Sequence, residues 1–148
     1  MFLRPKNYIA NGDFEIAGAA SITNWTAVSG TPVASSKFGN TLLLTNAEAS
    51  QEVTDLIVGR SYIVVTQTSG ATLTLEIGTS SGGSQTKSAT ITIASGNEVA
   101  LTETTFTATA TTHYVSFTEA AGNAAFVKLV ELSEDVLPIP LKYLSYEE

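Results

Sequence analysis

The 148-residue chain contains no cysteine, so a disulfide framework, a thiolate metal site and a cysteine nucleophile are all excluded. Positive charge is also scarce. Seven Lys and Arg residues stand against 14 Asp and Glu residues, and the formal net charge is −7. The chain has no basic cluster suited to a phosphate backbone or an anionic bilayer, so we expect neither nucleic acid nor a membrane as a partner.

Long apolar runs are missing as well. No stretch approaches the ~20 apolar residues that cross a membrane. The first six residues hold a proline and two cations where a secretory signal would have an apolar run. We expect a protein that is made in the cytoplasm, with export by another route left open.

Catalytic groups are few. The single histidine, His113, falls at an expected turn, and no Gly-x-Ser-x-Gly motif supplies a nucleophile for it. The acids that could form a hydrolytic pair are expected mostly on turns or solvent faces. They are Glu48, Glu52, Glu76, Glu98, Glu103 and Glu119. We therefore expect no enzyme, no catalytic residue and no cofactor.

What the sequence does have is alternation. Leu73, Leu75 and Ile77 share one face of an extended segment whose other face is polar, and this period of two predicts a half-buried strand. Denser apolar runs at 61–67 and 125–132 are typical of central or covered strands. Further strands are expected at 8–10, 25–29, 41–45, 50–54, 88–93, 105–110 and 114–118.

Glycine and asparagine separate these segments, as in Asn11-Gly12 and Gly122-Asn123, and permit the positive φ angles of tight turns. Segment 16–22 lacks an apolar face and is expected to be a loop or one turn. Many short strands joined in this way predict an all-β fold, an antiparallel two-sheet β-sandwich of the jelly-roll kind. We expect a short N-terminal arm at 1–6, the sandwich at 7–132 and an extended C-terminal arm at 133–148.

The C-terminal arm combines Pro138 and Pro140, which disfavour helix and central strand, with many apolar side chains. Fully extended, it could reach about 45 Å. It could lie on a neighbouring subunit or cover an edge of its own sheet. The residues expected to bind a partner are Val136, Leu137, Ile139, Leu141, Tyr143, Leu144 and Tyr146.

Asn7-Tyr8-Ile9, followed by Asn11-Gly12-Asp13-Phe14-Glu15 and then Trp25, resembles the opening of the galactose-binding-like β-sandwiches grouped with carbohydrate-binding modules of families four and nine. Segment 55–62 is similar to that family's loop into a strand beginning G-x-x-Y. Segments 105–109 and 114–117 are similar to its pair of strands with the F-T-A-T pattern, and 126–132 to its closing strand. The resemblance covers residues 7–132 and implies a β-sandwich.

Members of this family often hold a structural calcium ion with oxygens from the opening segment and an Asp on the closing strand. The resemblance makes Asp13 and Glu15 weak calcium candidates and places Lys128 at the Asp position. Either the ion is absent or the Lys128 ammonium occupies its place against Asp13 or Glu15. The alternative is a solvated turn anchored by a buried Phe14, and we expect no metal.

Carbohydrate binding in such modules uses planar aromatic rings in a cleft, because sugar C–H faces stack on them. The candidate sugar platform consists of Trp25, Tyr62 and Tyr114, with Tyr8 as a further candidate. Each also fits a strand pattern, and we expect Trp25 to pack in the core.

Two functions remain open. Similar sandwiches are accessory domains of tailed-phage particles, which implies a non-catalytic structural protein of the virion: a capsid cement or decoration protein, or a tail accessory protein. Such a protein would be synthesised in the host cytoplasm and bind other virion proteins and itself, with a homotrimer expected. The alternative is a carbohydrate-binding module. We favour the virion protein, on resemblance more than on chemistry.

Overall fold

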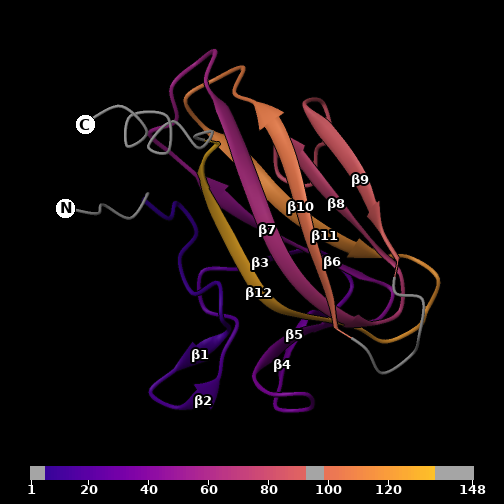
Figure 1. Cartoon of the computed structure of the whole chain (residues 1–148). Helices are drawn as coiled ribbons and strands as arrows, with labels where there is room; N and C mark the ends of the chain where they lie inside the picture. The colour runs from indigo at the N-terminus through magenta and orange to yellow at the C-terminus, as the bar shows by residue number, and fades with distance from the viewer. Residues whose placement is uncertain (1–5, 93–98, 136–148) are drawn as a thin grey trace, which may run out of the picture.

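Two five-stranded antiparallel sheets pack face to face in the computed structural model, which describes residues 6–92 and 99–135 (Figure 1). The first sheet has the strand order β10-β7-β12-β5-β4, and the second has the order β3-β6-β11-β8-β9. A small hairpin, β1-β2, lies apart from both near the start of the chain. The chain passes repeatedly from one sheet to the other, so the predicted antiparallel β-sandwich of the jelly-roll kind is confirmed.

The strands of the first sheet are β4 (Val33–Ser35), β5 (Thr41–Leu44), β7 (Ser61–Gly70), β10 (Ala100–Thr107) and β12 (Ala125–Glu134). Those of the second sheet are β3 (Thr26–Ser29), β6 (Ala47–Val53), β8 (Leu73–Gly78), β9 (Lys87–Ile91) and β11 (His113–Glu119). The hairpin consists of β1 (Glu15–Ile16) and β2 (Ala19–Ala20). In the described part of the chain no helix is long and apolar enough to cross a membrane.

The alternation in the sequence decides which side chains enter the core. On β8, Leu73, Leu75 and Ile77 are buried, as predicted, while Thr74 and Glu76 point outward. The two dense apolar runs became β7 and β12, which are neighbours within the first sheet. Their interior position follows from apolar residues on both faces.

Three expectations about strands were wrong. Segment 8–10 is not a strand, although the Tyr8 N–H donates to the Leu132 carbonyl (2.8 Å). Segment 16–22 was expected to be a loop, but it contains the hairpin, whose turn places Ala17 and Gly18 at positive φ. The segment expected at 105–110 is β10, which begins at Ala100 and ends at Thr107.

The core between the sheets is made of aliphatic side chains and one aromatic cluster. The Phe14 ring lies 5.5 Å from the Trp25 ring, and Trp25 lies 6.0 Å from Phe117. Phe14 and Phe117 are fully buried, so Phe14 is the predicted core anchor.

The boundary predicted at residue 132 stays a prediction; β12 continues to Glu134. The seven residues predicted for the partner-binding arm lie outside the described residues, and so does Glu98.

Candidate functional site

The opening motif is a structural unit rather than a ligand site. Asn11 has a positive φ of 50°. Its side-chain amide donates to the carbonyls of Ser21 (3.0 Å) and Thr23 (2.8 Å), and its Oδ1 accepts from the Glu15 N–H (3.1 Å). Next to it, the Gly12 carbonyl accepts the Val130 N–H on β12 (2.8 Å), and a Cβ on Gly12 would collide with the Val130 carbonyl. The motif therefore closes the first loop onto the sandwich.

Trp25 is part of the same unit. Its side chain is 7% exposed, and its indole N–H donates to the Asn11 carbonyl (3.2 Å). The ring packs between Phe14 and Phe117. Trp25 therefore does not offer a ring face to a sugar, which corrects its place in the candidate platform and confirms the expected packing in the core.

Tyr62 is also buried, with no exposed surface. It stacks on Phe106 at 5.8 Å, and its hydroxyl accepts the Ile57 N–H (2.9 Å). Its assignment to the sugar platform is wrong because an inward position on the central strand β7 places the ring between the sheets.

Tyr114 differs from the other two candidates. It lies on the outward face of β11 and is half-buried, and its hydroxyl donates to Glu52 Oε2 (3.4 Å) on the neighbouring strand β6. Of the three predicted platform residues, this one presents part of its ring to solvent.

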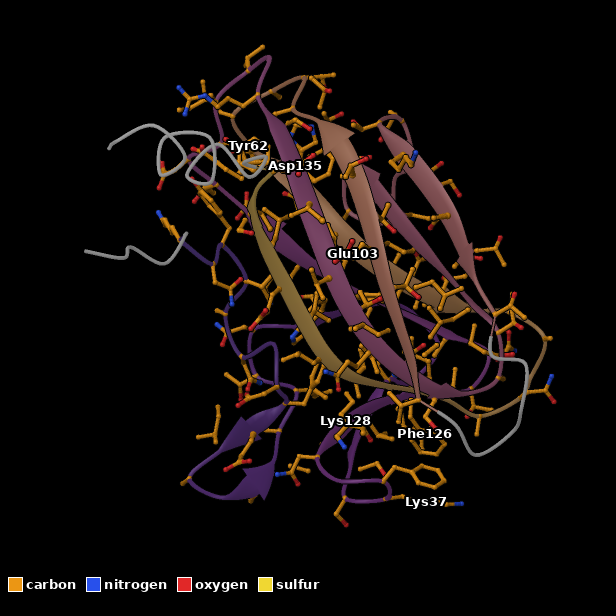
Figure 2. All side chains as sticks on the ribbon, in the orientation of Figure 1. Lys37, Tyr62, Glu103, Phe126, Lys128 and Asp135 are labelled. Carbon is orange, nitrogen blue, oxygen red and sulfur yellow. The ribbon has the colours of Figure 1, made fainter. Side chains whose placement is uncertain are left out.

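The calcium candidates are not gathered around a common point. Asp13 and Glu15 are exposed; Asp13 Oδ1 accepts the Glu15 N–H (3.3 Å), and Glu15 Oε1 accepts from the Asn40 amide (3.0 Å). Lys128 lies at a bulge in β12, and its side chain lies beside Gly39. Figure 2 shows Lys128 at the same end of the sandwich as Lys37 and Phe126. Within the described residues Lys128 makes no ion pair with either acid, and no three His, Asp or Glu side chains converge on a metal position.

A polar cleft of about 430 Å³ opens where the N-terminal segment crosses the ends of β3 and β6. Two of the residues that line the cleft use their side-chain amides in hydrogen bonds to the backbone. Asn7 Oδ1 accepts the N–H groups of Ile9 (3.1 Å) and Leu132 (3.0 Å), while the Gln51 amide bonds both backbone groups of Ala10. The cleft is lined by Lys6, Asn7, Tyr8, Ala10, Asn24, Thr26, Gln51, Glu52, Thr54 and Asp55.

The rim of this cleft carries the groups that a polar ligand would meet. Asn24 and Thr26 flank the inward-pointing Trp25, and both are exposed. Asn24 and Asp55 have positive φ angles of 79° and 68°. Backbone conformations of this kind are uncommon outside glycine and are enriched at functional sites. Glu52 both lines the cleft and accepts the hydrogen bond of the Tyr114 hydroxyl, so the Tyr114 side chain adjoins the rim at Glu52.

Tyr8 supplies an aromatic wall of the cleft. It is half-buried, its ring meets Tyr62 edge-on at 5.7 Å, and Lys6 Nζ lies 4.7 Å from its centre. Burial, then the nearby Tyr62 and Glu134, raise the pKa of Tyr8. The phenol is therefore neutral at physiological pH and can both donate and accept hydrogen bonds.

A second opening, of about 450 Å³, lies between β9 and β10. It is lined mainly by threonines, together with Ser61, Gln85, Lys87 and Phe106. Phe106 is 5% exposed, so this opening has no aromatic surface for a sugar.

Three of the candidate catalytic residues do not lie on the turns or solvent faces predicted for them: His113, Glu119 and Glu48. His113 is fully buried against Phe106, not on a turn, and its Nε2 lies 3.2 Å from the Thr109 hydroxyl; burial lowers its pKa. Glu119, expected on a turn or a solvent face, is 2% exposed and accepts four backbone N–H groups.

Glu48 forms the closest approach to a hydrolytic pair, together with Glu76. Burial first, and then a hydrogen bond and repulsion from Glu76, raise the pKa of Glu48. The pair lies under the β8–β9 loop and lines neither opening, so the geometry does not form a hydrolytic site in either of them.

Sequence reasoning missed most of the cleft. Asn24, Glu52 and Asp55 fit no motif. They come together because β3 pairs with β6, with Thr26 opposite Ser50, and the N-terminal segment adds the other wall of the cleft. One signal was present: Asn24 and Thr26 on either side of a core tryptophan had to point away from the core.

Comparison with solved structures gives the fold class. A scan against protein-family models finds no match, and a search of the curated proteins finds none either. Among solved structures, the chain is similar to TmCBM61 in complex with β-1,4-galactotriose, with 20% identity, a TM-score of 0.61, and coverage of 88% of this chain and 99% of that one. It is also similar to a family-four carbohydrate-binding module (14% identity, TM-score 0.59, 86% and 99% coverage).

A third similar structure is the enzymatically active domain of tailspike protein 4 from bacteriophage CBA120, with 18% identity and a TM-score of 0.62. The match covers 86% of this chain but only 21% of the tailspike chain. At these identities the comparisons establish the fold alone. The chain has the same β-sandwich fold as these carbohydrate-binding modules, as the resemblance over residues 7–132 predicted.

Proposed function

We propose that this chain is a non-catalytic carbohydrate-binding module that holds a neutral sugar in the cleft between the N-terminal segment and β6. The observation that carries the proposal is this cleft, which combines Tyr8 and the adjoining Tyr114 with exposed amide, carboxylate and hydroxyl groups. Sugar binding needs such a mixture, because ring faces stack on aromatics and hydroxyls need fixed donors and acceptors. Carbohydrate-binding modules with the same fold add support.

The roles of the cleft residues differ. Tyr114 would stack on a sugar ring, whereas Glu52 and Asn24 would bond its hydroxyls. Asn7 and Gln51 hold the floor in place and leave little hydrogen-bonding capacity for a ligand. This division separates variants that test binding from variants that disturb the fold.

The test is titration calorimetry of the full chain with soluble β-1,4-linked galacto-oligosaccharides, followed by other neutral oligosaccharides. Asn24→Ala and Glu52→Gln should each weaken binding about tenfold, the effect of losing one good hydrogen bond. Glu103→Gln, an exposed change on the outer face of the first sheet, should leave the affinity unchanged. If the cleft variants bind as tightly as the wild type, the sugar does not lie in this cleft.

Tyr114 allows a second, matched comparison. Tyr114→Ala should weaken binding about three- to tenfold by removing the ring, and Tyr114→Phe should retain most of the affinity. Equal loss in both variants would assign the effect to the Glu52 hydrogen bond instead. Absence of binding to every oligosaccharide at millimolar concentration would contradict the proposed function as a whole.

A second candidate is a structural protein of a tailed-phage particle, a capsid cement or decoration protein or a tail accessory protein. The similarity to a phage tailspike domain favours it. In this case the arm residues, Val136 to Tyr146, would bind virion proteins or another copy of the chain, with a homotrimer as the expected assembly. Peptide mass spectrometry of purified particles from the source lysate tests this candidate, and absence of the chain from the particles would contradict it.

A further inference from the structure

The outer face of the first sheet carries apolar side chains where an antiparallel sheet is usually polar. Three rows cross β10, β7 and β12 in register: Thr105–Ile63–Ser133, Glu103–Val65–Glu131 and Leu101–Gln67–Leu129. We call these nine residues the outer β7 face. Four of the nine are aliphatic, namely Ile63, Val65, Leu129 and Leu101, and Leu101 is 67% exposed.

The second sheet has a very different outer face. Its central rows are polar, with Ser50 opposite Ser116 and Glu48 opposite Thr118. The β8–β9 loop covers them, since the Gly82 N–H donates to Ser116 Oγ (3.2 Å). The β8–β9 loop thus covers the polar outer face of the second sheet. No described segment covers the four aliphatic side chains of the outer β7 face to the same extent.

The chain leaves the described structure at one end of the outer β7 face. The Asp135 N–H donates to the Ser61 carbonyl (2.9 Å), and the Ser61 hydroxyl lies 3.4 Å from Asp135 Oδ2. Figure 2 shows Asp135 beside Tyr62 at one end of the sandwich, with Glu103 farther along β10. The first apolar residue of the face, Ile63, is therefore one row away from the point where segment 136–148 begins.

The sequence of that segment matches the face in its spacing. Leu137, Ile139, Leu141 and Tyr143 occupy every second position. Two residues of extended chain span about 6.7 Å, which is also the separation of successive rows on a sheet face. Pro138 and Pro140 fall on the opposite side of this alternation, and because they have no N–H to donate, they suit a segment that lies on a sheet without joining its hydrogen-bond ladder.

We infer that segment 136–148 turns back after β12 and lies across the outer β7 face of its own chain. Ile139, Leu141 and Tyr143 then cover the rows of Ile63, Val65 and Leu101 in turn. In this register Lys142 shares the outward side with Pro138 and Pro140. The occupant is the chain's own segment rather than a second copy, because a tether of a few residues gives an effective concentration in the millimolar range.

Disulfide trapping tests this inference directly, because the chain has no cysteine of its own. The full chain carries Val65→Cys on the face together with Ile139→Cys, Leu141→Cys or Tyr143→Cys. The control pairs each segment position with Thr74→Cys on the outward face of β8, in the other sheet. Under mild oxidation the Val65 pairs should cross-link within one chain at least tenfold faster than the Thr74 pairs.

Equal rates for the two sets would overturn the inference. Mixing isotope-labelled and unlabelled chains separates links within a chain from links between chains, and links found only between chains would overturn it too, by assigning the segment to a partner. A second readout is the methyl NMR spectrum of the full chain with Ile139→Ser and Leu141→Ser. The signals of Val65 and Leu129 should shift while those of the core residue Leu75 stay in place; unmoved Val65 and Leu129 signals would contradict the docking. Neither measurement depends on sugar binding.

Discussion

The β11–β12 loop covers Glu119 and the β8–β9 loop covers Glu48, and the surroundings shift the pKa values of the two carboxyl groups in opposite directions. Under the β11–β12 loop, Glu119 accepts N–H groups from Asn46 (2.7 Å), Ala121 (3.1 Å), Gly122 (3.0 Å) and Asn123 (3.1 Å). Burial alone would raise its pKa, but these four hydrogen bonds outweigh burial and lower it. The anion is therefore part of the fold.

Under the β8–β9 loop, Glu48 meets another acid instead. One of its oxygens is buried without a hydrogen-bond partner among the described residues, and burial and Glu76 together raise its pKa. The loop above is held by hydroxyl contacts, Ser81 to Ser50 (3.2 Å) and the Gly82 N–H to Ser116 (3.2 Å). Burying a carboxyl group thus stabilises a loop only when donors surround it, and the β8–β9 loop should be the weaker of the two.

The largest effect should come from Glu119→Gln. The amide nitrogen that replaces one oxygen would face backbone donors, so that two N–H groups lose their acceptor at a site that is only 2% exposed. We expect a loss of about 3 kcal/mol in the free energy of unfolding, measured by urea denaturation. Glu103→Gln, an exposed counterpart, should change it by less than about 0.5 kcal/mol. If the two variants were equally stable, Glu119 would not anchor the loop.

The same residue should govern stability in acid. Because the pKa of Glu119 is lower in the fold than its ordinary value of 4.5, its contribution is fully present above pH 4.5 and is lost as the pH falls through the folded pKa. The wild type should therefore lose stability below pH 4.5 more steeply than Glu119→Gln. His113, whose pKa is also lowered, adds a loss that begins near 6.5 in both proteins and cancels in the difference. Parallel curves would contradict the prediction.

A smaller effect is expected from Gly82→Ala in the other loop. Gly82 has a φ of +75°, and an added Cβ would lie 3.0 Å from Val28 Cγ1 and 3.2 Å from Glu48 Oε2. The left-handed backbone and these contacts should together cost about 1.5 kcal/mol. Gly122→Ala is the matched control, because φ is +87° there but no atom lies within 4 Å of the new Cβ. If Gly82→Ala lost no more free energy of unfolding than Gly122→Ala, the added Cβ would not clash with Val28 or Glu48.

The sequence predicted the sheets far better than these loops. Alternation identified the inward residues of β8, because a period of two directly decides which side chains meet the core. The dense apolar run at 61–67 identified the central place of β7. The opening motif led to Phe14 and, through the resemblance, to the fold. Glu119 gave no such signal: its donors come from residue 46 and from 121–123, and only the folded chain brings them together.

The candidate site was predicted only in part. The sequence named three aromatic residues as a candidate platform, but the burial of Trp25 and Tyr62 depends on which way each ring turns at a loop or on a central strand. Tyr114 was named only as an aromatic residue in a strand pattern, and the structure places it on an outward position of β11. The cleft itself depends on the path of residues 6–10 over β6, which is set by the Gln51 amide and not by any local pattern.

The smallest effect, and the one with the opposite sign, should come from Glu48→Gln. Its folded pKa is raised above 4.5, so the fold favours the protonated form; this contribution is present below pH 4.5 and is lost as the pH rises through the folded pKa. An amide at this position keeps the shape of the protonated acid, carries no charge at neutral pH and can donate a hydrogen bond to Glu76. We expect Glu48→Gln to raise the free energy of unfolding at pH 7 by about 0.5 kcal/mol and to have no advantage at pH 4. Glu52→Gln, an exposed change four residues further along β6, is the control and should show no such dependence on pH. If Glu48→Gln destabilised the protein at pH 7 as Glu119→Gln does, then Glu48 would also be held as an anion, and the contrast between the two loops would be wrong.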